Sequence, residues 1–138
     1  MSASFANAAV GAELPALVLP PITRHMLALY CGASGDHNPL HTDIDFAHRA
    51  GLPDVIAHGM FTMALVSRML TRWAPQNRLR AYGVRFVGQV TIGDVVTCEA
   101  VVAEIREHAD GRRAHLQLTA RKQSGEQVLV GDAEVSLG

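Results

Sequence analysis

The stretch of sequence that decides the fold reads MFTMALVSRMLTR and spans Met60–Arg72. It is apolar on most sides, and a narrow polar strip near its end consists of Ser67, Arg68, Thr71 and Arg72. A helix with such a surface is normally buried in the protein interior. The pattern therefore predicts a buried helix at the centre of the fold, against which other elements pack.

After this helix, from Leu79 onward, the apolar residues recur at every second position, which is typical of half-buried strands. The segment Val95–Ile105 is rich in β-branched residues, and the segment 114–121 alternates cleanly between apolar and polar residues. The last strand, Val128–Leu137, changes phase near Gly131, which predicts a β-bulge there. Helices followed by four strands predict an α+β fold with an antiparallel sheet packed on the buried helix.

Two shorter helices are expected before the central one. Thr23 suits the N-cap of the first, which Gly35 should end. The second is expected to begin near Asp43 and to stop at Gly51. The segment between them contains Pro39, which cannot lie inside a helix, and it is therefore expected to be a loop.

The bulk composition predicts one packed domain over residues 1–138, with 49% hydrophobic residues. A net charge of −1 provides no global field that would favour nucleic acid or an anionic membrane. The residues Met1–Val10 contain no Lys or Arg and do not resemble a secretory signal. Cys31 and Cys98 are too few for a disulfide framework, so we expect reduced thiols in a cytoplasmic protein.

The loop at Pro39 places a carboxylate, Asp36, five positions before an imidazole, His41. An acid and a base on a kinked loop suit proton transfer to or from a bound small molecule. The alternative is that Asp36 caps a turn and His41 is a surface histidine. A calcium loop that starts at Asp36 is excluded, because its sixth and twelfth positions would be His41 and Ala47 instead of Gly and Glu.

A second candidate feature is the start of the central helix at His58-Gly59. The residues before Met60 include no strong N-cap side chain, so several backbone amides lack partners. These amides could bind a carbonyl oxygen or an oxyanion, and Gly59 would permit its close approach. The alternative is that Gly59 is a tolerated cap and that water satisfies the amides.

The segments DHNPLH (Asp36–His41) and AHGM (Ala57–Met60) together closely resemble the hydratase-2 motif. This motif marks the MaoC-like (R)-specific enoyl-CoA hydratases and the related 3-hydroxyacyl-thioester dehydratases. Val84-Arg85-Phe86 and Gly93-Asp94 also resemble this family, and the likeness extends from about Gly11 to Leu137.

The resemblance implies a hot-dog fold, in which an antiparallel sheet wraps around a long central helix and two subunits pair edge to edge. It implies that Asp36 and His41 are the catalytic pair, that Asn38 helps to orient them at the substrate site, and that the Gly59 amide binds the thioester oxygen. The implied reaction is the reversible hydration of trans-2-enoyl thioesters to (R)-3-hydroxyacyl thioesters. No metal or redox cofactor is implied, because the coenzyme A or acyl-carrier-protein arm belongs to the substrate.

Two rival functions remain open. A hot-dog acyl-thioester hydrolase would share the scaffold, since a fold alone does not define a reaction. The chain could also belong to a heterodimer of hot-dog subunits instead of a homodimer. In that case the presence of Asp36 and His41 would make it the catalytic subunit of a heterodimeric 3-hydroxyacyl-ACP dehydratase.

Overall fold

The computed structural model describes residues 4–138, so residues 1–3 of the predicted domain and N-terminal segment lie outside the described residues. The helices and strands follow one another as β1 (Leu17–Val18), α1 (Arg24–Ser34), α2 (Ile44–Arg49), α3 (Gly59–Trp73), β2 (Leu79–Phe86), β3 (Thr97–His108), β4 (Gly111–Arg121) and β5 (Gln127–Ser136). Short 3-10 turns cover Phe5–Asn7, Pro39–His41 and Gln76–Arg78. Within residues 4–138, no helix has both the length and the hydrophobicity needed to cross a membrane.

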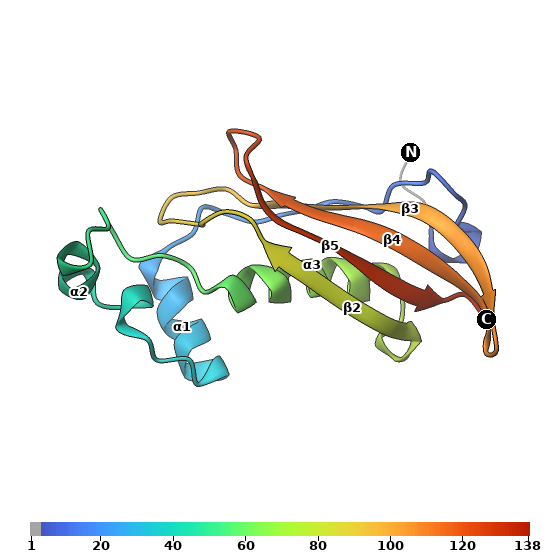
Figure 1. The fold of residues 1–138 in the computed structure, drawn as a ribbon, viewed down its shortest axis with the longest axis horizontal. Helices are drawn as coiled ribbons and strands as arrows, with labels where there is room; N and C mark the ends of the chain where they lie inside the picture. The colour runs from blue at the N-terminus through green and yellow to red at the C-terminus, as the bar shows by residue number, and fades with distance from the viewer. Residues whose placement is uncertain (1–3) are drawn as a thin grey trace.

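The strands form one antiparallel sheet in the order β1-β3-β4-β5-β2, with β1 and β2 at its edges. Figure 1 shows the sheet curving over α3, while α1 and α2 lie beyond one end of the sheet. The alternation predicted for residues 114–121 is present, since Ala114, Leu116, Leu118 and Ala120 are all buried. The predicted α+β class with an antiparallel sheet packed on a long helix is therefore confirmed.

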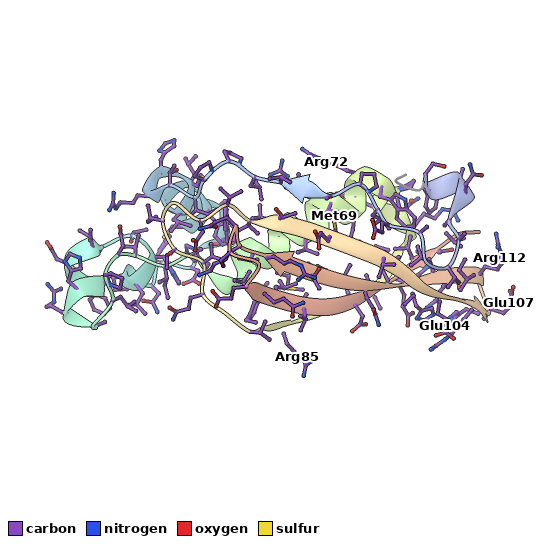
Figure 2. All side chains as sticks on the ribbon, turned by 90° about the horizontal axis from the view of Figure 1, so that it is seen from above. Met69, Arg72, Arg85, Glu104, Glu107 and Arg112 are labelled. Carbon is purple, nitrogen blue, oxygen red and sulfur yellow. The ribbon has the colours of Figure 1, made fainter. Side chains whose placement is uncertain are left out.

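The central helix α3 has one buried face and one exposed face. The buried face consists of Phe61, Thr62, Leu65, Val66, Met69, Leu70 and Trp73. On the opposite face Met60 is 54% exposed, and Arg72 projects outward (Figure 2). Three residues of the predicted polar strip, Arg68, Thr71 and Arg72, are exposed as expected, but the apolar Met60 is exposed as well, because the sheet covers α3 from one side.

The helix α1 begins and ends as its sequence predicts. The Thr23 hydroxyl accepts a hydrogen bond from the Met26 amide at 3.1 Å, which caps the helix. Gly35 adopts a left-handed conformation with φ of 76° and terminates it. The chain therefore leaves α1 immediately before Asp36, and this fixes where the acidic residue enters the loop.

The predicted β-bulge at Gly131 is wrong. Gly131 pairs in regular register with both β4 and β2. The register shifts instead at Val128, which is skipped in the pairing of β5 with β4. Val128 and its neighbour Leu129 are both fully buried, and two consecutive buried residues produce the change of phase seen in the sequence.

Gly131 has a different structural requirement, which is close contact with β2. A methyl group there would collide with the Gly83 carbonyl oxygen and lie 2.9 Å from the Val84 Cα. Gly131→Ala is expected to lower the free energy of unfolding by about 1–3 kcal/mol, the usual cost of overpacking. Urea denaturation measures this loss. Gly83→Ala is the matched control, because an added methyl group there meets no atom within 4 Å; an equal loss in both variants would contradict the prediction.

Candidate active site

The loop after Gly35 is shaped by its own polar groups. The Asn38 side-chain oxygen accepts a hydrogen bond from the Leu40 amide at 3.1 Å and caps the 3-10 turn that follows. The Asn38 amide donates to Asp36 Oδ1 at 3.3 Å. Asn38 therefore contacts the carboxylate through its main chain, and its side chain stabilises the turn. Its role in orienting the catalytic pair at the substrate site stays a prediction.

The loop brings the side chains of Asp36 and His41 close to each other. His41 Nδ1 lies 2.7 Å from the Ile56 main-chain oxygen. Because a carbonyl oxygen only accepts hydrogen bonds, Nδ1 carries the proton and Nε2 of the neutral ring has a free lone pair. This Nε2 lies 4.0 Å from Asp36 Oδ2. The separation is too long for a direct hydrogen bond, but one water molecule could bond to both atoms.

The two members of the pair differ in their exposure to solvent. The His41 side chain is 12% exposed, whereas that of Asp36 is 50% exposed. The imidazole is therefore largely shielded from solvent, whereas the carboxylate is open to it.

Gly59 is the first residue of α3 and directly follows His58, whose ring stacks on that of His41. Among residues 4–138, no group accepts a hydrogen bond from the Gly59 amide, and the N-cap residue His58 provides no capping side chain. The positive end of the helix dipole lies at the same point. The predicted donor for a carbonyl oxygen or oxyanion is thus free to bind one. The Phe86 ring covers the other side of Gly59, 3.2 Å from where a Cβ would lie.

Sequence reasoning quoted His58 but gave it no role, and the structure places it against both members of the pair. Its side chain is 1% exposed, and its Nε2 lies 3.2 Å from the Asp36 main-chain oxygen. Its ring stacks on His41, with centroids 3.7 Å apart and planes inclined by 24°. Burial lowers the pKa of His58. No local sequence pattern signals this role, because the neighbouring Gly59 and Met60 at the start of the same helix are exposed.

The two cysteines are free and buried, and neither is suited to act as a nucleophile. The Cys31 Sγ donates a weak hydrogen bond to the Asp36 main-chain oxygen at 3.0 Å. Burial raises the pKa of Cys98 to about 12, so this thiol does not ionise near neutral pH. Cys31 is buried within α1, and its contact with Asp36 gives it a structural role in the loop.

Asp36, His41 and His58 carry potential metal ligands within 4.8 Å of one another. A metal ion lies in the plane of an imidazole that binds it, about 2 Å from the nitrogen. The ring planes of His41 and His58 are inclined by only 24°, and the ring centroids are 3.7 Å apart. The two planes therefore intersect much farther from the rings than a metal–nitrogen bond reaches. One ion therefore cannot bind both imidazoles in this arrangement. The donor set does not fit a metal centre.

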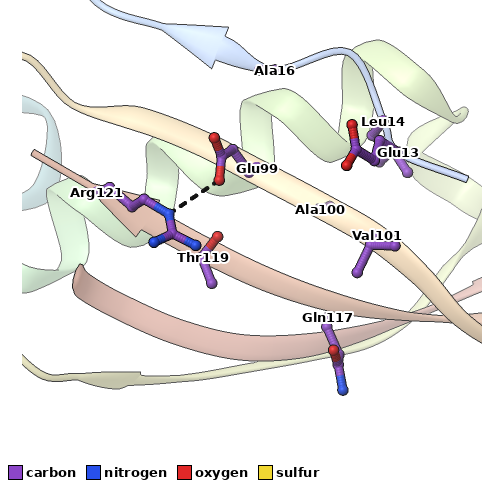
Figure 3. Close-up of a pocket in the computed structure, with 9 residues that line it drawn as sticks. All are labelled: Glu13, Leu14, Ala16, Glu99, Ala100, Val101, Gln117, Thr119 and Arg121. Carbon is purple, nitrogen blue, oxygen red and sulfur yellow. Dashed lines mark hydrogen bonds and ion pairs between the residues drawn. The ribbon is translucent and has the colours of Figure 1, made fainter. Parts of the chain in front are cut away.

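Two shallow grooves lie on the outer face of the sheet, away from the Asp36–His41 loop. One of about 380 Å³ is lined by residues of β3 and β4 and by the segment before β1 (Figure 3). Its basic residue, Arg121, is already paired, since its Nε lies 3.2 Å from Glu99 Oε2. Neither groove is lined by a histidine or by any residue predicted for the site, so the acid–base pair at the start of α3 is the candidate active site.

Comparison with known proteins identifies the family. The model of the MaoC like domain matches residues 6–123. The solved structure of the (R)-hydratase from A. caviae involved in PHA biosynthesis is 30% identical, with a TM-score of 0.83 over 94% of this chain and 97% of that one. This similarity confirms the hot-dog fold.

Two curated relatives extend the comparison. The 3-hydroxyacyl-thioester dehydratase X of Mycobacterium tuberculosis is 44% identical over 78 residues, which are 56% of this chain and 27% of that protein. The fatty acid synthase subunit beta of Aspergillus oryzae is 40% identical over 113 residues, which are 78% of this chain. The chain spans only 5% of the length of that subunit. A family match over most of the chain and a fold shared with a solved hydratase together show that this protein belongs to the MaoC-like family of hydratases and dehydratases.

Proposed function

We propose that the protein catalyses the reversible hydration of trans-2-enoyl thioesters to (R)-3-hydroxyacyl thioesters. The observation that carries this proposal is the 4.0 Å gap between His41 Nε2 and Asp36 Oδ2, next to the unpaired Gly59 amide. The similarity to an (R)-hydratase supports the (R) configuration. The substrate class is supported by the similarity to a 3-hydroxyacyl-thioester dehydratase.

The first step is the attack of water on the double bond. A water molecule between Asp36 and His41 donates one hydrogen bond to each, because Asp36 Oδ2 and His41 Nε2 are both acceptors. Its own lone pair then faces outward, toward C3 of the bound enoyl group. As the new C–O bond forms, the pair accepts the proton that the water loses.

The charge that develops in this step is stabilised at the start of α3. The thioester oxygen accepts a hydrogen bond from the Gly59 amide, and it becomes an enolate-like oxygen as C3 is attacked. The acid–base pair then returns a proton to C2, which completes the addition of water. Dehydration follows the same steps in reverse. No metal or redox cofactor takes part, and the coenzyme A or acyl-carrier-protein arm enters with the substrate.

We further propose that the working unit is a homodimer or a heterodimer of hot-dog subunits. Phe86 and Val87, at the end of the edge strand β2, are 49% and 51% exposed, and Arg85 projects outward from this strand (Figure 2). Met60 on α3 is also exposed. A second subunit over these apolar side chains would shield the Gly59 amide from water. The free thiols of the chain are in keeping with a cytoplasmic location.

Sedimentation and activity of the purified chain test the proposed assembly. An active homodimer is expected if the chain pairs with itself. A monomer that becomes active only with a second hot-dog subunit would identify the heterodimer. An active monomer would contradict the proposal that a second subunit completes the site.

Removal of either member of the pair tests the reaction. Asp36→Asn and His41→Ala are each expected to lower kcat by at least about 10²-fold, because each removes a positioned proton acceptor. Crotonyl-CoA is a suitable substrate, since hydration removes the absorbance of its conjugated double bond. Asp45→Asn is the control, as it alters an exposed acid in the first turn of α2. Near-normal hydration by either variant would contradict the assigned roles, and free thiol release without hydration would identify the hydrolase.

A proline at position 59 tests the backbone donor alone. The first position of a helix tolerates proline, and His58 has φ −59° and ψ 137°, a polyproline II-like conformation that a residue before proline favours. Gly59→Pro therefore removes the amide hydrogen at little cost to the helix. Gly59→Ala is the matched control, because it also adds a Cβ next to Phe86 but keeps the donor.

The expected result is a kcat for Gly59→Pro about 10²–10³-fold below that of Gly59→Ala, the usual cost of losing one oxyanion donor. Circular dichroism verifies that α3 is intact in both variants. Equal kcat values in two folded variants would show that the Gly59 amide does not stabilise the transition state.

A further inference from the structure

We propose that His58 is the positioning residue of the active site: it holds the main chain of Asp36 by one hydrogen bond and the ring of His41 by stacking, while remaining neutral itself. This inference rests on the proposed function, in which Asp36 and His41 activate water. It assigns a role to a buried side chain that the reaction steps above do not use.

The hydrogen bond acts on the acid. His58 Nε2 lies 3.2 Å from the Asp36 main-chain oxygen, and the Cys31 Sγ lies 3.0 Å from the same oxygen. Asp36 is on an otherwise exposed loop, and its carboxylate is half exposed. Two buried donors on its carbonyl therefore fix the position from which the carboxylate extends. Of the two, the imidazole is the stronger donor, because S–H is a weak one.

The stacking acts on the base. The hydrogen bond from His41 Nδ1 to the Ile56 carbonyl fixes one edge of the ring, but a single bond leaves the ring free to turn about it. His58 covers one face of that ring, with centroids 3.7 Å apart. Ile56 and His58 are two residues apart in the same segment, so the hydrogen bond and the stacking contact hold the His41 ring in one position relative to that segment. The direction of the Nε2 lone pair is thereby set.

Neutrality follows from the surroundings of the ring. His58 Nε2 must be the protonated nitrogen, because it faces a carbonyl oxygen. Its Nδ1 is buried and has no hydrogen-bond partner within the described part of the chain. A second proton would place a buried N–H without an acceptor and a cation against His41. The titratable groups around the ring are Asp36, His41, Tyr30 and Cys31.

Two substitutions separate the two contacts of His58. His58→Phe keeps a flat ring against His41 but has no donor for the Asp36 carbonyl, whereas His58→Gln keeps a donor but has no ring. Each variant is expected to lower kcat for crotonyl-CoA by about 10–100-fold, because a small displacement of a catalytic group has an effect of this size. KM is expected to change less than about 3-fold, since neither contact reaches the substrate.

His108→Phe is the matched control, because this half-buried histidine contacts another histidine at the far end of the sheet. It is expected to retain the wild-type kcat. A wild-type kcat in either folded His58 variant would overturn the role of the corresponding contact. A loss confined to KM would also overturn the proposal, because it would indicate a substrate contact.

A measurement on the unaltered protein guards against variants that fail to fold. Nitrogen NMR of the histidine rings is expected to show His58 as the neutral form with hydrogen on Nε2 down to about pH 6.5, where a free histidine is half protonated. A protonated ring at that pH, or hydrogen on Nδ1, would overturn the inference. If Asp36→Asn keeps full activity, the proposed function fails instead, and the tautomer of His58 remains measurable.

Discussion

The proposed active site depends on the segment Ile56–His58, which hydrogen-bonds to the Asp36–His41 loop and to the loop between β2 and β3. The Ile56 amide donates to the Leu40 carbonyl at 3.1 Å, and the Ile56 carbonyl accepts from His41 Nδ1 at 2.7 Å. The Ala57 amide donates to the Val90 carbonyl at 2.8 Å, which connects the segment to the loop between β2 and β3. With the contact from His58 to Asp36, the segment fixes the catalytic loop from one side.

This segment is rigid because α3 follows it directly. Val55 before it is fully buried, and so are Val66 and Leu70 further along the helix. Each such side chain contributes about 1.5–3 kcal/mol by its burial. Displacing the segment would pull the start of α3 away from the sheet and would expose part of this core. The stability of the core is therefore what keeps the loop, the imidazole and the Gly59 amide in one arrangement.

Local sequence patterns predicted the elements that local interactions determine. Thr23 and Gly35 set the two ends of α1 through contacts within a few residues. Pro39 likewise marks the loop locally, because a proline cannot lie inside a helix. The role of His58 was missed because its partner Asp36 lies 22 residues away, and only the tertiary fold brings the two together. The exposure of Met60 was missed because an apolar sequence does not reveal which side of α3 a single sheet covers. The bulge was predicted at Gly131 but lies at Val128. The error arose because the two adjacent buried residues Val128 and Leu129 change the phase of the apolar pattern, and the sequence does not show at which residue the strand pairing shifts.

A comparison of two histidine pairs explains why the proposed proton transfer is assigned to His41 and not to the pair at the far end of the sheet. His108 and His115 have their Nε2 atoms 3.2 Å apart and their centroids 5.4 Å apart, so their nitrogens point almost directly at each other. When one ring donates and the other accepts, neither Nε2 is left free for a substrate. His41 and His58 instead stack face to face, with centroids 3.7 Å apart, and their ring nitrogens bond to main-chain carbonyls. Only this second geometry leaves a lone pair on His41 Nε2, and the structure places that lone pair opposite a carboxylate and next to a free helix amide.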